Sequence, residues 1–157
     1  MKEKPPIHLL LRFSNNIYKG DTIAAHQEVI NQYGAVWFGK MGSPVSQVHV
    51  DKLNQQVDEN IPTYVYLVKG NRRKSTIYHS TLFLASKTLP NDEAYLVPRY
   101  YADLNISKYV RLWVKLGDFD PLETVELNKM KVASSVLPIG ETLVKSSSGH
   151  FIICALN

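Results

Sequence analysis

The hydrophobic positions fall in short runs, separated by residues that favour turns. Residues 7–13 (IHLLLRF) are mostly apolar, which predicts a buried strand because the run is too short for a core helix. In residues 20–34 the apolar positions recur near helical spacing. Asp21 can cap the N-terminus of this helix and Gly34 can close its C-terminus. The pattern therefore predicts a strand followed by a helix.

The next two segments repeat this order. Residues 35–38 (AVWF) predict a second strand, and residues 45–60 predict a second helix. The apolar residues expected on the inward face of this helix are Val48, Leu53 and Val57.

The remainder of the chain is rich in β-forming residues. Residues 62–70 and 75–86 predict a hairpin around the basic sequence NRRK, whereas residues 97–109 show no regular pattern. Residues 110–115 alternate as a strand does, with Trp113 on the same face as two cations, so this ring could be exposed. A short helix and a final apolar strand are predicted after them.

The predicted strands are not separated regularly by helices, which argues against a doubly wound parallel sheet. We therefore expect an α+β fold, in which a small curved mixed β-barrel is flanked by two or three helices. The length of 157 residues suits a single domain over residues 1–157.

Composition narrows the functional classes. Hydrophobic residues make up 45% of the chain and charged residues 20%, which is typical of a globular protein. No apolar run reaches the roughly 18 residues of a membrane span, and no signal peptide is recognised. Cys154 is the only cysteine, which excludes an internal disulfide and makes a cytoplasmic location the default expectation. The net charge of +4 would suit a polyanionic partner, although lysine-rich surfaces without one are common.

Residues 34–41 (GAVWFGKM) nearly match the phosphate-loop pattern G-x-x-x-x-G-K-[ST]. Met41 stands where a hydroxyl would bind magnesium, and the four residues between the glycines favour a strand. Pro44 would also delay any following helix. We reject a nucleotide site of this kind and expect Gly39 and Gly42 to form a turn.

The other polar residues form no catalytic or metal-binding pattern. The five histidines show no i, i+4 pair and have no cysteine companion. Cys154 lies in the apolar run FIICAL, where a buried and inert thiol is the usual outcome. We expect no cofactor, no metal and no catalytic residue, although catalytic groups can lie far apart in a sequence.

Aromatic and basic residues remain as candidate ligand contacts. In a half-buried strand over residues 35–38, either Trp37 or Phe38 would point away from the core. A flipped base can stack on such rings while its edge is read by hydrogen bonds. Further aromatic candidates near strand ends or loops are Tyr66, Tyr78, Tyr100 and Tyr101.

Cations supply candidate phosphate contacts. Three of them lie at the tip of the predicted hairpin and one follows the second strand, and a solvated turn would explain the first three equally well. These residues are Arg72, Arg73, Lys74 and Lys40.

Six segments carry a resemblance to a known family. In order they are LLLRFSNN, GAVWFGK, TYVYLVKG, STIYHSTLFLAS, VRLWVKLGDF and KVASSVLPIGETLVKSSSGHFI. Together, from about residue 7 to residue 156, they resemble the YTH and EVE branch of the PUA-like superfamily. The resemblance implies a small, strongly curved β-barrel flanked by helices.

The resemblance also implies a function. YTH domains read N6-methyladenine in RNA by flipping the base into an aromatic cage. EVE-like domains are linked to modified DNA bases, including as N-terminal readers of McrBC-type restriction GTPases. The implied function is a non-catalytic reader of a modified, methylated base in DNA. Such a reader would serve a restriction or defence system, with a motor or nuclease domain or subunit as partner.

Two groups of residues match the family's site. The polar segment after its first strand falls on Ser14, Asn15 and Asn16, which could equally form only a turn. The first cage tryptophan of the family falls on Trp37, and it is followed by Phe38 and Gly39.

The chain departs from the YTH pattern at the hairpin. The second cage tryptophan has no match in LVKGNRRKSTIY, so Tyr66 or Tyr78 would have to substitute for it. Trp113 matches a position that is structural in the family. The departure leaves the identity of the modified base open, and also the choice between DNA and RNA.

Three alternatives stand beside the reader of modified DNA. The first is an RNA-binding PUA-like or YTH-like module that reads N6-methyladenine. The second is a small enzyme acting on nucleotides, and the third is a protein-interaction domain that uses the basic hairpin.

Overall fold

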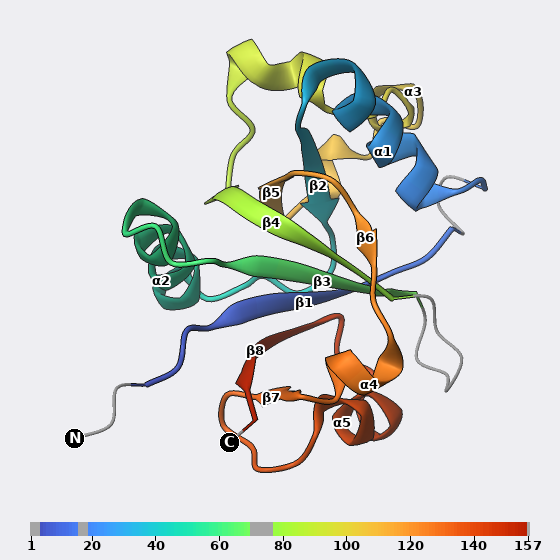
Figure 1. Cartoon of the computed structure of the whole chain (residues 1–157). Coiled ribbons are helices and arrows are strands. Elements are labelled where there is room, and N and C mark those ends of the chain that lie inside the picture. Colours follow the sequence, from blue (N-terminus) through green and yellow to red (C-terminus); the bar gives the residue numbers. More distant parts are fainter. Residues whose placement is uncertain (1–3, 16–18, 70–76, 157) are drawn as a thin grey trace.

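The computed structural model describes residues 4–15, 19–69 and 77–156. In this part of the chain, eight strands form one curved, mixed sheet with the order β2-β5-β4-β3-β1-β8-β7, and β6 pairs with β4 beside this path. Helices lie around the sheet (Figure 1). The strands are β1 (His8–Phe13), β2 (Val36–Lys40), β3 (Tyr64–Lys69), β4 (Ile77–Ser86), β5 (Leu112–Leu116), β6 (Asp120–Pro121), β7 (Met130–Val132) and β8 (His150–Ala155).

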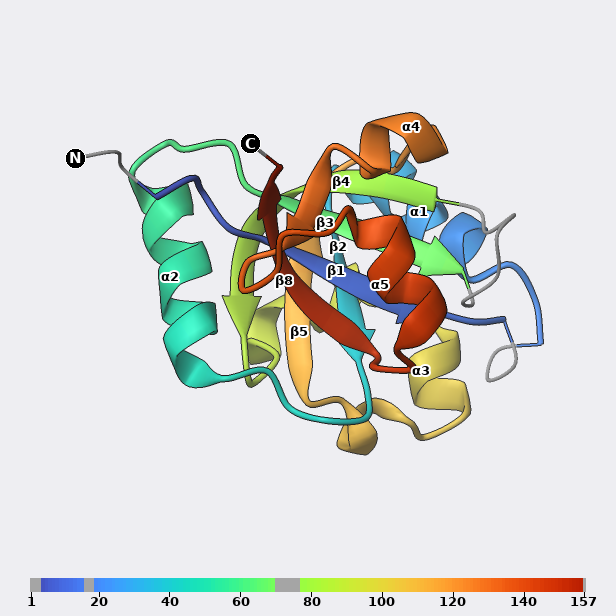
Figure 2. The same ribbon diagram turned by 90° about the horizontal axis from the view of Figure 1, so that it is seen from below.

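The helices differ in length. Two have twelve residues, α1 (Thr22–Tyr33) and α2 (Gln47–Asp58). Figure 2 shows α2 on one side of the molecule and α3 and α5 on the opposite side. The short helices are η1 (Asn91–Leu96), α3 (Tyr100–Asp103), η2 (Ser107–Tyr109), α4 (Thr124–Leu127) and α5 (Ile139–Lys145).

The predicted α+β class is confirmed, and the sheet is curved but not closed. The central strand β1 pairs in parallel with β3, where Leu9 lies opposite Val65, and antiparallel with β8. The other pairings are antiparallel, including the predicted pairing of β3 with β4. The end strand β2 pairs with β5 and with no other described strand.

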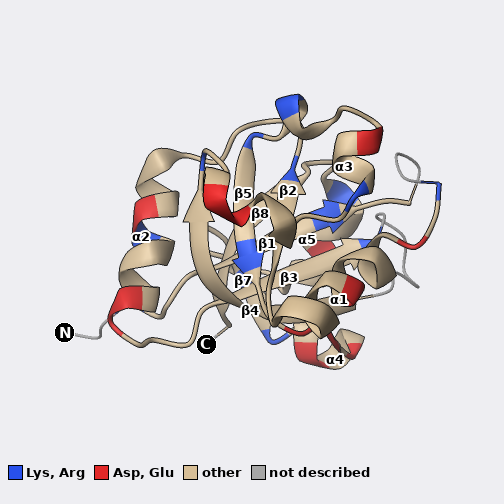
Figure 3. Ribbon diagram, turned by 90° about the horizontal axis from the view of Figure 1, so that it is seen from above, with Lys and Arg blue, Asp and Glu red and all other residues tan. Residues whose placement is uncertain are grey.

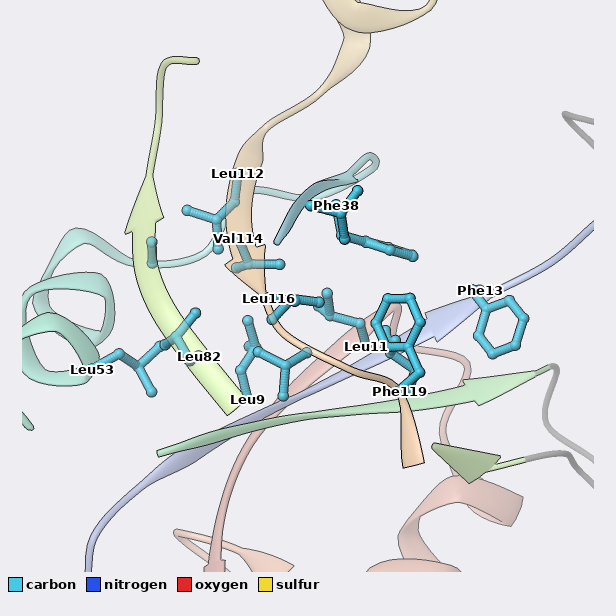
Figure 4. Packing of buried hydrophobic residues seen from close by; sticks show 14 of the residues in the cluster. Leu9, Leu11, Phe13, Phe38, Leu53, Leu82, Leu112, Val114, Leu116 and Phe119 are labelled. Carbon is cyan, nitrogen blue, oxygen red and sulfur yellow. The ribbon is translucent and has the colours of Figure 1, made fainter. Parts of the chain in front are cut away.

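Successive side chains of a strand point to opposite sides, and at β1 both faces of the sheet are covered by a hydrophobic core. Leu9 and Leu11 of β1 belong to the main core, whereas Leu10 between them belongs to a second core with β7, α4 and α5. Figure 4 shows the main core, with Leu53 of α2 pointing towards Leu82 of β4. Burial on both faces explains why the strands read as apolar runs.

The signals at the ends of α1 are confirmed. The Asp21 side chain accepts a hydrogen bond from the Ala24 amide, as an N-cap does. Gly34 has φ +88° and its amide donates to the Ile30 carbonyl, so it ends the helix in the left-handed conformation.

Four local expectations are wrong. Val48 of α2 is exposed, because Val50, Leu53 and Gln56 form the buried face of this helix. Trp113 is buried, because η1 and α3 cover this side of β5. Gly39 lies inside β2 and not in a turn, whereas Gly42 does adopt a positive φ of 84°. Part of residues 97–109, expected to be irregular, forms the short helices α3 and η2.

None of the described helices combines the length and the apolar character that a membrane crossing requires.

Candidate functional site

A cavity of about 500 Å³ lies where β1 and β2 both end. Both strands contribute lining residues, although β1 and β2 are not paired in the sheet. Segments from α1, α3 and the α5–β8 connection complete its walls. The lining residues are Arg12, Phe13, Ser14, Thr22, Phe38, Gly39, Lys40, Met41, Tyr100, Tyr101, Ile106, Ser147 and Gly149.

Aromatic rings form one side of the cavity. The rings of Tyr100 and Tyr101 lie 4.7 Å apart at an angle of 31°. Phe38 packs against His26, with 4.5 Å between the ring centroids. Phe38 and Tyr101 are buried and Tyr100 is half-buried, so part of the Tyr100 surface remains available to a ligand.

A chain of hydrogen bonds fixes this aromatic side. Nδ1 of His26 lies 2.7 Å from the Thr22 carbonyl, so it carries the ring proton and donates it. Nε2 of His26 is then an acceptor, and it receives the hydroxyl proton of Tyr101 over 3.0 Å. The Tyr101 oxygen in turn accepts from the Gly39 amide at 3.0 Å. The chain joins α1, α3 and β2, and it uses both hydrogen-bonding functions of the Tyr101 hydroxyl.

Burial keeps the members of this chain neutral. Desolvation lowers the pKa of His26 to about 4, although the bond to the Thr22 carbonyl acts in the opposite direction. Desolvation also raises the pKa of Tyr101 well above its usual value, and the neighbouring Tyr100 contributes to this increase. At neutral pH the aromatic wall therefore carries no charge.

Gly39 permits the close approach of α3 to β2. A Cβ atom at this position would lie 2.7 Å from Cγ2 of Val110 and 2.9 Å from Cε2 of Tyr101. It would also lie 3.2 Å from Cζ3 of Trp113. A side chain at Gly39 would consequently displace the wall of the cavity.

Two cations also line the cavity. Arg12 of β1 donates from Nε to the Ser148 carbonyl at 2.8 Å and from Nη2 to the Leu143 and Ser146 carbonyls. These bonds tie β1 to the α5–β8 connection. Desolvation lowers the pKa of Arg12, but the guanidinium stays charged at neutral pH.

Lys40 is buried at the end of β2. Its Nζ donates to the carbonyl of Met41 at 2.9 Å and to that of Ser43. Desolvation lowers its pKa most, followed by the charges of Lys87 and Arg111. Among the described residues that line the cavity there is no Asp or Glu, so Arg12 and Lys40 favour an anionic group there.

The comparisons with known proteins assign this fold. A family model described as Pua-like matches residues 9–149. The chain belongs to the PUA-like family. PUA-like domains are generally associated with binding RNA and other nucleic acids, and they are generally non-catalytic binding modules. No curated protein and no solved structure matches the chain significantly.

In this PUA-like domain, the cavity brings together several residues that the sequence singled out from three separate segments. They are Ser14, Phe38, Gly39, Lys40, Tyr100 and Tyr101. Their part in ligand binding stays a prediction.

Trp37 does not line this cavity. It is fully buried on the opposite face of β2, in a third core with Leu96, Tyr101 and Trp113. The Lys115 ammonium lies 5.9 Å from the centre of its ring. The expectation that either Trp37 or Phe38 would point away from the core is wrong, since both faces of β2 are covered.

The two tyrosines proposed as substitutes for the second cage tryptophan also lie elsewhere. Tyr66 belongs to the second core and its ring is close to His8, Tyr64 and His79. Tyr78 is partly buried against the main core. Neither residue contributes to the cavity at the ends of β1 and β2.

Asn15 has a structural partner. Its Oδ1 accepts a hydrogen bond from the Thr22 amide at 2.9 Å, which fixes the start of α1 next to the end of β1. Four other candidates, Asn16, Arg72, Arg73 and Lys74, lie outside the described residues.

Several residues in or next to the cavity were not among those predicted from the sequence. Arg12 had a visible signal, because it is the one charged residue in the apolar run of residues 7–13. His26, Ser147 and Gly149 had none, since their position depends on contacts between distant segments. The described residues also contain no group of three or more His, Cys, Asp or Glu side chains that could hold a metal ion.

Proposed function

We propose that this PUA-like domain reads a modified, methylated base in DNA by accepting the flipped base in the cavity between β1 and β2. The observation that carries the proposal is the composition of the cavity. Uncharged aromatic rings and the two cations Arg12 and Lys40 line the same cavity. An aromatic surface suits a base, and the cations suit the phosphates that flank it.

The energetics set a requirement on the cavity. Extruding one nucleotide costs a few kcal/mol of unstacking and unpairing. Stacking on an aromatic ring returns about 1–3 kcal/mol per base. Burial of a methyl group adds only about 0.8 kcal/mol, so selectivity must also come from shape and from hydrogen bonds.

Hydrogen bonds to the base edge would come from groups other than the Tyr101 hydroxyl, which the Gly39 amide and His26 already occupy. Ser14 and Ser147, which carry hydroxyl groups, belong to the residues that line the same cavity. A hydroxyl both donates and accepts, so it can match either kind of group on a base edge.

An RNA reader is the second candidate, and the general association of PUA-like domains with RNA favours it. The two functions differ in their dependence on the 2′-hydroxyl. A DNA reader would bind a modified deoxyribonucleotide strand at least as tightly as the RNA strand of the same sequence.

The decisive experiment is a panel of matched single strands and duplexes, in DNA and in RNA, at one stated salt concentration. The strands carry N6-methyladenine, 5-methylcytosine, 4-methylcytosine, 5-hydroxymethylcytosine or no modification. One modified DNA strand should bind more tightly than its unmodified counterpart. Equal affinities throughout the panel would refute modified-base reading, and tighter binding of modified RNA would favour the second candidate.

A variant pair assigns the binding to the cavity. Tyr100→Ala removes a half-buried ring that lines the cavity, and stacking predicts a loss of about 1–3 kcal/mol in binding free energy. Tyr109→Ala removes an exposed tyrosine that does not line it and should bind as the wild type does. Equal effects of the two variants would place the ligand elsewhere.

The wider proposal is that the domain serves a modification-dependent restriction or defence system in the cytoplasm, with a motor or nuclease domain or subunit as partner. The sequence resemblance supports this role. Cells that produce the protein with its partner should resist phage whose DNA carries the preferred modification, and should not resist the same phage with unmodified DNA.

An enzyme acting on nucleotides would instead convert the modified nucleoside during incubation.

A further inference from the structure

Two lysine side chains bind the loop between β2 and α2, and three further basic residues lie near them. We call them the loop basic cluster, which consists of Lys40, His49, Lys87, Arg111 and His150. Nζ of Lys40 donates to the carbonyls of Met41 and Ser43, and Nζ of Lys87 donates to that of Val45. The two lysines therefore hold the same short loop. Figure 3 shows Lys and Arg positions at the adjacent ends of β2 and β5.

The other three members come from separate elements. The Arg111 amide donates to the Lys40 carbonyl at 2.7 Å, which places the start of β5 beside the end of β2. His49 lies in the first turn of α2 and His150 is the first residue of β8. The charges of Lys40, His49 and Lys87 all act on the imidazole of His150, so each of the three lies within electrostatic reach of His150.

The cluster contains no acidic partner for its lysines and arginine. In the described part of the chain, no ion pair includes Lys40, Lys87 or Arg111. The ion pairs there are His79–Asp120, Arg99–Asp103, Lys115–Glu93 and Lys129–Glu126. Grouping like charges around a buried lysine without a counter-ion is unfavourable, and a bound anion would offset this cost.

The cluster also retains hydrogen-bond donors. An ammonium group has three protons, and the described contacts use two on Lys40 and one on Lys87. Nδ1 of His150 is buried and has no hydrogen-bond partner. Burial lowers the pKa of His150 most, followed by the charges of Lys40, His49 and Lys87, and an anion would act in the opposite direction.

We propose that the loop basic cluster binds a phosphate group and that His150 takes up a proton when the phosphate binds. Lys40 belongs both to this cluster and to the cavity lining, and Gly149 of the lining precedes His150. The phosphate would then flank the nucleotide whose base enters the cavity. This assignment to a nucleic-acid phosphate rests on the proposed function, whereas oxyanion binding itself does not.

The test measures binding of a labelled, unmodified thymidine oligonucleotide by fluorescence anisotropy, as a function of salt and of pH. Lys87→Met and Arg111→Met should each lower the log–log salt slope by up to about 0.7, the value per phosphate contact on single strands. Lys129→Met is the matched control, because it removes the same charge from an exposed lysine that does not belong to the loop basic cluster. Lys87→Arg should restore binding, and an unchanged slope in both Met variants would overturn the proposal.

The pH series tests His150. The charge of a phosphodiester is constant between about pH 5.5 and 7.5, so a change in affinity reports on the protein. Affinity should rise as the pH falls, by up to about tenfold per unit for one coupled proton. His150→Gln should remove this dependence. If His49→Gln removes it and His150→Gln does not, the assignment to His150 is wrong.

Inorganic sulfate separates the two sources of the ligand. Sulfate that replaces chloride at constant ionic strength should compete with the oligonucleotide in the wild type and less in Lys87→Met. Competition by sulfate without any change in the oligonucleotide salt slope of the variants would make the cluster a site for free oxyanions and refute a nucleic-acid phosphate there.

The proposed reading of modified bases fails independently. It predicts a difference between modified and unmodified strands, whereas the cluster should strengthen both equally. If the Met variants keep the salt slope of the wild type and modified strands still bind more tightly than unmodified ones, only the proposed phosphate site is refuted.

Discussion

The Tyr101 hydroxyl donates its proton to Nε2 of His26 across 3.0 Å, although 75 residues separate them in sequence. The same oxygen accepts the Gly39 amide, so one phenol group holds α1, α3 and the free edge of β2 together. The aromatic side of the cavity is thus held in place by a buried hydrogen-bond chain.

Tyr101→Phe should destabilise the protein by about 1–3 kcal/mol, since it leaves the Gly39 amide and Nε2 of His26 unpaired in a buried position. The ring is retained, so packing against Trp113 should change little. Urea unfolding measures the effect, and a free energy of unfolding equal to that of the wild type would show that water replaces the hydroxyl.

Gly39→Ala should destabilise the protein by about 1–3 kcal/mol, because the added methyl overlaps Val110 and Tyr101. Gly149→Ala is the matched control within the same cavity lining, since a Cβ atom there meets nothing within 4 Å. Melting temperatures of both variants check the prediction. It is wrong if the two substitutions have the same effect.

Stability should fall as the pH drops below 6.5. Burial lowers the pKa of both His8 and His26 to about 4, so the folded state stays neutral where the unfolded histidines take up protons. Above pH 6.5 neither state is protonated and the effect vanishes. Between about pH 6.5 and 5, each histidine should remove about 2 kcal/mol from the free energy of unfolding.

The contribution of His8 can be separated. Nδ1 of His8 accepts the Tyr64 amide, and an asparagine oxygen can replace this acceptor. His8→Asn should roughly halve the pH dependence in this window, measured by urea unfolding at several pH values. An unchanged slope would show that the pKa of His8 is not lowered in the folded state.

Trp37→Ala should destabilise the protein by about 3–5 kcal/mol, because it empties the centre of the third core. Trp37→Phe should retain the fold and, below its melting temperature, bind nucleic acid as the wild type does. Loss of binding in Trp37→Phe with unchanged stability would return Trp37 to the ligand contacts that the family resemblance implies.

Asn15→Ala should cost about 0.5–2 kcal/mol, the range for side chains that bond to the first amides of a helix. The preference for a modified strand should not change, since the amide oxygen of Asn15 already binds Thr22. Thermal unfolding and a binding ratio measured side by side check both statements, and a reduced ratio would support a direct contact with the base.

The sequence determined the features that depend on neighbouring residues. Asp21 and Gly34 fixed the ends of α1 through local hydrogen bonds and backbone conformation, and the hairpin of β3 and β4 followed from two adjacent β-rich runs. The strand predicted between the two glycines of the phosphate-loop-like segment is also present, since β2 spans Val36–Lys40.

Only the tertiary structure decided which strand faces are covered. Alternation correctly placed Trp37 and Phe38 on opposite sides of β2, but both sides are buried, because η1 and α3 pack on the one that would otherwise meet solvent. Likewise, no local pattern could place His26 against Tyr101, or Lys87 against the loop that Lys40 holds. These contacts join distant segments, and their positions follow from the order and curvature of the sheet, which periodicity along a single strand does not encode.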